Sequence, residues 1–169
     1  LGEVFWGGIM QGVLFIALIS FFLRGRHALP WSRVGLVTDE ENRWLCTGLK
    51  QGVLLFILVV ILGTIITLLF PIELEPQPIA EVIMSARNFR ELLLPLFVAA
   101  VMAPISEELY FRGFLYPALR NWLGRMPALI IASSFFGLVH FDLIRFLPIA
   151  LGGVWLTLLY ERTGSLYTS

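Results

Sequence analysis

Charged residues are scarce in this chain of 169 residues. Only 14% of them are Asp, Glu, Lys or Arg, whereas a soluble domain carries about 25%, which argues against a water-soluble globular enzyme. The 12 basic residues are offset by 12 acidic ones, so no net positive charge attracts phosphates, and nucleic acid is set aside as a partner. The single cysteine, Cys46, cannot form an internal disulfide, and no zinc-finger spacing of Cys and His occurs.

Long apolar runs take the place of the missing charges. Val4–Leu23 and Gln51–Phe70 are uncharged throughout, and each has the length of about 20 residues that a helix needs to cross the bilayer. Three shorter apolar stretches are interrupted by Pro or Gly, and they cover Leu92–Ser106, Met126–Phe141 and Phe146–Tyr160. The sequence therefore predicts an all-α protein, a polytopic transmembrane bundle of about five apolar helices forming one membrane-embedded domain over residues 1–169.

The third apolar stretch is too short to cross the membrane by itself. To reach the far side, its helix must continue through Glu107, Glu108 and Arg112, which brings ionisable groups into or against the bilayer. Charged groups in such a place are costly and are usually functional. Pro104, one turn before the acids, is expected to kink or restart the helix.

The distribution of Lys and Arg predicts the orientation in the membrane. The segment Arg24–Lys50 holds five of them and the segment Pro71–Glu91 holds two. By the positive-inside rule, the first segment is cytoplasmic and the amino terminus lies outside. Alternation of the spans returns Arg112, Arg120 and Arg125 to the cytoplasmic side, and only Arg145 is misplaced. We expect an integral protein of a bacterial cytoplasmic membrane, with its site towards the cytoplasmic half.

The first candidate site motif is the acidic pair followed by an arginine. Glu108 and Arg112 are four residues apart, so on a helix they share a face, and the acid-before-base order favours their pairing. Glu107 points about 100° away and keeps its carboxylate available. Such a carboxylate is a candidate general base.

The second motif is Phe136 followed by His140, one helical turn later on the same face. Gly124 and Pro127 mark a turn, so the two motifs are expected on the arms of a helical hairpin. Counted from that turn, Glu107 is about 18 residues before it and His140 about 15 after it, a difference of about 4.5 Å in depth. We therefore expect the carboxylate and the imidazole to face one another across a polar cavity, within reach of one water molecule.

Simpler interpretations exist for each motif taken alone. A Glu-Glu pair at a helix end is often a solvated interfacial charge, and a histidine among aromatic residues often belongs to an interfacial belt. No His-Glu-x-x-His occurs, nor the serine or aspartyl motifs of other intramembrane proteases. Proton transport stays open, because buried acids and histidines also relay protons.

Together the motifs resemble those of the CAAX protease and bacteriocin-processing family of intramembrane proteases, also called ABI or Rce1-like. The signature Glu-Glu-x-x-x-Arg is met by Glu107, Glu108 and Arg112, and Phe-x-x-x-His by Phe136 and His140. The resemblance is clearest over residues 92–169, the protease-like core. The family's third signature, His-x-x-x-Asn, is absent, and Gly164–Ser169 is similar to the lead-in to the helix that carries it. We expect the native chain to continue into that helix, with the oxyanion donor on it, and this fragment to be inactive.

The resemblance implies an intramembrane endopeptidase in which Glu107 and His140 activate water. Glu108, Arg112 and Phe136 would be supporting residues. No cofactor is expected; if a divalent metal such as zinc is used, Glu107 and His140 would hold it. The implied partners are a membrane-associated peptide or protein substrate and the lipid bilayer. The alternatives are a non-catalytic scaffold or bacteriocin-immunity protein on the same fold, and a proton-coupled transporter.

Overall fold

The computed structural model describes residues 2–26, 30–38, 43–70 and 76–169. Within these ranges every regular element is a helix. Three of the described helices are long and apolar enough to cross a membrane, and they cover Trp6–Leu23, Arg43–Leu69 and Phe89–Leu123. The prediction of an all-α membrane protein is confirmed.

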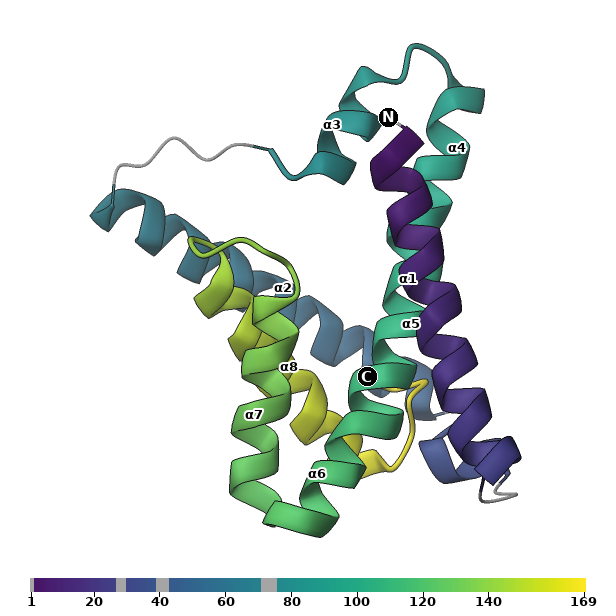
Figure 1. Ribbon diagram of the computed structural model, residues 1–169. Helices are drawn as coiled ribbons and strands as arrows, with labels where there is room; N and C mark the ends of the chain where they lie inside the picture. The colour runs from purple at the N-terminus through teal and green to yellow at the C-terminus, as the bar shows by residue number, and fades with distance from the viewer. Residues whose placement is uncertain (1, 27–29, 39–42, 71–75) are drawn as a thin grey trace. The chain divides into compact units, whose positions relative to one another are not determined.

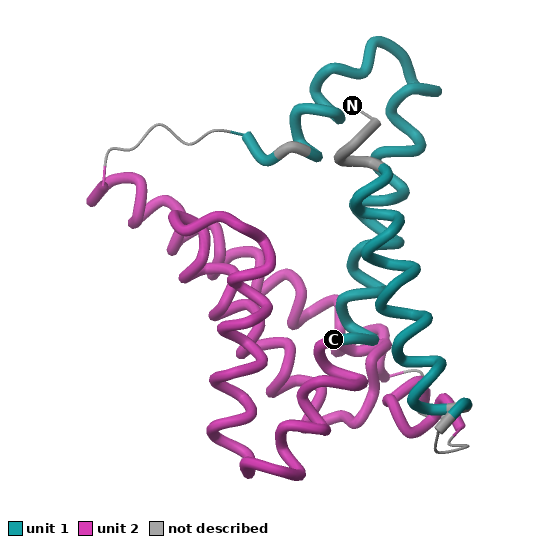
Figure 2. The backbone as a smooth tube through the Cα atoms, in the orientation of Figure 1, with its two compact units in different colours: residues 1–28, 73–110 teal, residues 29–72, 111–169 magenta. Residues whose placement is uncertain are grey.

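The backbone forms two compact units (Figure 2), made of residues 1–28 with 73–110, and of residues 29–72 with 111–169. Each is described here by itself. The first holds α1 (Gly2–Ser20), the π-helical η1 (Phe21–Arg26), α3 (Pro78–Ser85), α4 (Phe89–Phe97), the π-helical η3 (Val98–Met102) and α5 (Ala103–Glu108). The second holds the 3₁₀ turn η2 (Trp31–Val34), α2 (Arg43–Leu69), α6 (Tyr116–Leu123), α7 (Arg125–Leu138) and α8 (Phe146–Thr163).

In the first unit, α1 lies along the helix that carries the acidic pair (Figure 1). A Cβ placed on Gly12 would lie 3.5 Å from the hydroxyl of Ser106, so glycine lets the two backbones approach closely. One turn further on, Phe15 stacks on Tyr110 with 4.1 Å between ring centroids. Both contacts advance in the same chain direction, so the two helices run parallel. This is the arrangement expected of two spans when the span between them crosses back.

The third apolar helix continues through the charged motif, as predicted. It runs from Phe89 to Leu123 without leaving helical conformation, but its hydrogen bonding changes along the way. A π-helical segment, η3, precedes Pro104, and α-helical bonding restarts at Ala103, in agreement with the predicted restart. A second π-helical segment, η4 (Leu109–Leu115), follows the acids. The wider π turns accommodate a proline that has no N–H to donate.

In the second unit, α7 and α8 pack side by side as an antiparallel pair (Figure 1). A Cβ on Gly153 of α8 would lie 3.2 Å from the Cα of Ser133 on α7, and Ala132 beside it is buried. Small side chains at these positions let the helices approach closely, as in many membrane helix pairs. Tyr116 fills the remaining core from α6.

Two predicted segment boundaries are wrong. α2 begins at Arg43, eight residues before Gln51, because apolar runs locate the part of a helix that fits hydrocarbon, whereas backbone bonding continues into the headgroup region. The segment Pro71–Glu91, interpreted as a connection, contains α3, which starts at Pro78 because proline suits the first helical turn. Residues 71–75 of that segment and 27–29 and 39–42 of the earlier one lie outside the described residues.

Glu161 joins the end of α8 to the turn between α6 and α7. Its carboxylate lies 2.8 Å from Nε of Arg125 and 3.5 Å from Nε of Arg120, and its side chain is 8% exposed. Burial alone would raise the pKa of Glu161, but hydrogen bonding to Tyr116 and Arg125, together with the charges of Arg125 and Arg120, holds that pKa below its usual range. The basic residues used to predict orientation therefore also hold the hairpin to α8.

Replacing Glu161 by Gln is expected to lower the thermal stability of the protein in detergent at neutral pH. A carboxylate whose pKa is lowered by folding contributes stability above its unfolded pKa of about 4.3 and loses it as the pH falls through the folded value. The difference in melting temperature between wild type and variant should therefore shrink in acid. The exposed Arg162 provides the control Arg162→Gln, which should change stability little at either pH. Equal melting temperatures for Glu161→Gln and wild type at neutral pH would contradict this assignment.

Candidate active site

The acidic pair lies on a short α-helical segment with π-helical turns on both sides. α5 has six residues, with η3 before it and η4 after it, and both Glu107 and Glu108 are half-buried. π-helical turns are rare in proteins overall, but those that occur are often found at functional sites, where they reorient side chains. The change from α-helical to π-helical bonding at Leu109 also alters the angle around the helix axis between residues four apart. The predicted Glu108–Arg112 pairing assumed the α-helical angle.

Arg112 is buried in the second unit against an aromatic ring. Its side chain is the largest of the fully buried ones, with 1% exposed, and its guanidinium carbon lies 4.3 Å from the ring centroid of Phe136. A cation over an aromatic face is stabilised by about 2 kcal/mol when desolvated. Phe111 meets the same ring edge-on at 5.0 Å. The aromatic ring of the second motif thus supports the arginine of the first.

His140 meets the edge of the same phenylalanine ring, with 5.0 Å between centroids. Its Nδ1 lies 2.7 Å from the carbonyl oxygen of Phe136. Because a carbonyl only accepts hydrogen bonds, Nδ1 carries the hydrogen, and in the neutral imidazole Nε2 then holds the lone pair. The ring is therefore oriented with a basic nitrogen directed away from its own helix.

His140 lies in the turn after α7 rather than on the helix itself. α7 ends at Leu138, and the amide of His140 donates to the carbonyl of Gly137 at 3.3 Å. Phe141 then adopts the left-handed region, with φ of 52°, which ends the helix. The expectation of a helical position is corrected, while the predicted spacing of one turn from Phe136 is kept, because His140 bonds back to that turn.

The structure thus brings together three of the five predicted site residues. Arg112, Phe136 and His140 assemble within the second unit. Glu107 and Glu108 belong to the first unit, so the approach of Glu107 to His140, and of Glu108 to Arg112, stays a prediction. The hairpin that was expected between the motifs is present, with Gly124 at its turn in an extended conformation of positive φ (φ of 84°, ψ of 176°) that favours glycine.

Phe111 and the stacking of Arg112 were not predicted from the sequence. Charge reasoning assigned Arg112 to Glu108, its neighbour along the helix. The aromatic partner comes from α7, and spacing along one helix does not report contacts with another. The signal available in the sequence was a large apolar residue at position 111, directly before the arginine of the first motif.

Among the described residues, no three or more His, Cys, Asp or Glu side chains cluster closely enough to hold a metal ion. Catalytic zinc usually has three protein ligands. The expectation of no cofactor, with Glu107 and His140 as ligands if zinc is used, stays a prediction.

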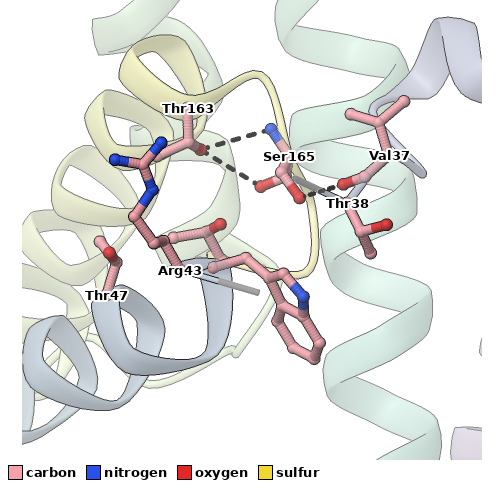
Figure 3. Close-up of a pocket in the computed structure, with 8 residues that line it drawn as sticks. Val37, Thr38, Arg43, Thr47, Thr163 and Ser165 are labelled. Carbon is pink, nitrogen blue, oxygen red and sulfur yellow. Dashed lines mark hydrogen bonds between the residues drawn. The ribbon is translucent and has the colours of Figure 1, made fainter. Parts of the chain in front are cut away.

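A polar pocket of about 270 Å³ lies elsewhere in the second unit (Figure 3). It lies between the start of α2 and the segment after α8, and its lining is Val37, Thr38, Arg43, Trp44, Thr47, Thr163, Ser165 and Thr168. Ser165 donates its hydroxyl to the carbonyl of Val37, and the amide of Leu166 donates to the carbonyl of Gly35 at 2.8 Å. These bonds fix residues 165–168 against the chain that precedes α2. None of the predicted site residues lines the pocket.

The fold and the assembled side chains define an integral membrane protein of the helical class with an acid, arginine and histidine motif set. Comparison with known families then identifies the carboxyl-terminal segment. Residues 89–169 match the family model described as "Type II CAAX prenyl endopeptidase Rce1-like". This segment contains every site residue named from the sequence, and the predicted resemblance is confirmed for it.

Individual relatives agree with the family match. The chain is 26% identical to "CAAX prenyl protease 2" of Homo sapiens over 114 residues, which cover 64% of this chain and 35% of that protein. It is 36% identical to "Putative membrane peptidase YdiL" of Bacillus subtilis (strain 168) over 70 residues, which cover 41% and 29%. The chain thus spans about a third of the length of these curated relatives. No solved structure matches it.

Proposed function

We propose that the complete protein is an intramembrane endopeptidase of the CAAX prenyl protease kind. The observation that carries this proposal is the family match over residues 89–169, because it includes both motifs in their order. Their chemistry is compatible with hydrolysis: a carboxylate and a neutral imidazole can activate water, and the arginine and phenylalanine support the imidazole.

In the proposed reaction, water is held between Glu107 and Nε2 of His140. Glu107 accepts a proton from the water as its oxygen attacks the scissile carbonyl, and His140 orients and polarises the same water by accepting its other hydrogen. The tetrahedral intermediate then collapses with rupture of the carbon–nitrogen bond. Glu107 returns its proton to the leaving amine, so one water is consumed and the carboxylate is restored.

The supporting residues act by positioning. The carbonyl of Phe136 fixes the imidazole tautomer through Nδ1, as backbone carbonyls do for many functional histidines. Arg112, stacked on Phe136, holds that ring against rotation and would supply the charge that orients Glu108. The names of the relatives point to a membrane-associated protein with a carboxyl-terminal CAAX segment and a prenyl group as the substrate class.

The proposal predicts cleavage of such a peptide by the complete protein in lipid vesicles. Peptides of one sequence, with and without the prenyl group, are incubated in water enriched in ¹⁸O and read by mass spectrometry. We expect a shortened product that carries one ¹⁸O in its new carboxylate, formed faster from the prenylated peptide. Folded protein that leaves both peptides intact would contradict the peptidase assignment, and equal rates would contradict the substrate class alone.

A further inference from the structure

The turn between α7 and α8 exposes its apolar side chains and hides its charged ones. Phe141 and Leu143 are 94% and 85% exposed, whereas the side chains of Asp142 and Arg145 are only 16% and 29% exposed. A turn that faces water has the opposite pattern, because charged side chains are almost always directed into solvent. This distribution indicates apolar surroundings.

The two charges of the turn neutralise one another. One carboxylate oxygen of Asp142 accepts a hydrogen bond from the backbone amide of Arg145 at 2.9 Å, and the other pairs with the guanidinium of Arg145. The carboxylate therefore satisfies both the cation and an N–H at the start of α8, which has no partner within the helix. Charges inside a membrane are tolerated when they are paired in this way.

The length of α7 places this turn short of the opposite membrane surface. α7 starts at Arg125, whose side chain is 59% exposed, as expected at the water boundary. From there its 14 residues rise about 21 Å, less than the ~30 Å of hydrocarbon. The outward side of α7 is apolar along this length, with Met126, Ile130 and Leu138 all more than half exposed.

We propose that the turn between α7 and α8 lies within the hydrocarbon of the bilayer, and that Phe141 and Leu143 contact lipid acyl chains. The left-handed backbone at Phe141, with φ of 52°, is uncommon for a bulky residue and places this ring outside the helix pair. The depth of the turn does not depend on peptidase activity. Because His140 directly precedes Phe141, the imidazole then lies about as deep as the turn, roughly 21 Å from Arg125 and past the midplane of the hydrocarbon. The proposal therefore departs from the expectation, drawn from charge counting, of a site in the cytoplasmic half.

Site-specific fluorescence in vesicles tests the depth of the turn. In the complete protein with Cys46 replaced by Ser, and any cysteine outside residues 1–169 also replaced, a single cysteine is introduced by Phe141→Cys and labelled with an environment-sensitive fluorophore. Asn121→Cys, on the exposed last turn of α6, is the matched control. We expect quenching of the label at 141 by lipids with nitroxides on their acyl chains to be several-fold stronger than at 121. Quenching by aqueous iodide should show the reverse order.

Two results would overturn the proposal. Iodide quenching at 141 as strong as at 121 would place the turn in water. Shielding from both quenchers would mean that protein, for instance a second copy of the chain, covers the turn. Leu143→Cys repeats the measurement at a second position, in case the label at 141 disturbs folding. Because the readout is fluorescence, its failure is distinguishable from a failure of the cleavage assay.

Discussion

Replacing Glu107 by Gln in the complete protein is expected to lower kcat for peptide cleavage by about 100- to 10,000-fold, the range that a positioned general base contributes. Gln keeps the size and polarity of the side chain but cannot accept the proton of the attacking water. Single-turnover cleavage in vesicles measures the chemical step directly. The melting temperature should stay close to that of the wild type, because an amide preserves most of the packing.

The control for this variant is a second acid of the same unit. Glu81 lies exposed on α3, so Glu81→Gln changes the charge of the unit equally without touching the motif, and its kcat should equal that of the wild type. Glu107→Asp adds a further distinction: it keeps the base but shortens it, so it should recover part of the rate. Glu107→Gln with wild-type kcat would show that another group takes the proton.

The extent of the apolar helices was predictable because it depends on a property of single segments. A run such as Val4–Leu23 is apolar and uncharged, so lipid suits it better than water. α1 follows that run closely. The start of α2 was not predictable in the same way, since Arg43 and Lys50 are compatible both with a helix end and with a loop. Backbone hydrogen bonding decides where α2 begins, and hydropathy does not report hydrogen bonding.

The site was predictable along each helix but not between helices. The spacing of Phe136 and His140 sufficed to place their rings in contact, because residues four apart face each other on a helical turn. The stack of Arg112 on Phe136 joins η4 to α7, and no spacing rule connects them. The π-helical register after Leu109 is a further effect of tertiary packing.

Charge counting treated Arg145 as misplaced because it considered every cation separately. In the structure this cation is paired with Asp142 inside its own turn, so the turn itself carries no net charge. Phe141, in the same turn, is an apolar residue that is exposed. Because the charges are paired and Phe141 is exposed, the turn is apolar in character although it contains two charged residues.

Replacing His140 separates the two tasks that its imidazole performs. In His140→Asn the side-chain amide takes the place of Nδ1 and can still donate to the carbonyl of Phe136, but nothing replaces the lone pair of Nε2. We expect cleavage to fall by about 100- to 10,000-fold with little additional loss of stability. In His140→Ala the carbonyl loses its donor as well, so this variant should lose the same activity and unfold more easily than His140→Asn by about 0.5 to 1.5 kcal/mol, the usual net value of one hydrogen bond.

Both variants lose the ring contact with Phe136, so their difference isolates the hydrogen bond at the end of α7. Denaturant unfolding of the two proteins in the same detergent gives the stability term, and single-turnover cleavage gives the catalytic one. A His140→Asn enzyme that cleaves at the wild-type rate would show that the histidine serves only to end the helix. Equal stability of the Asn and Ala variants would instead show that the bond to Phe136 sets the direction of the ring without strengthening the fold, leaving the orientation of Nε2 as its whole contribution.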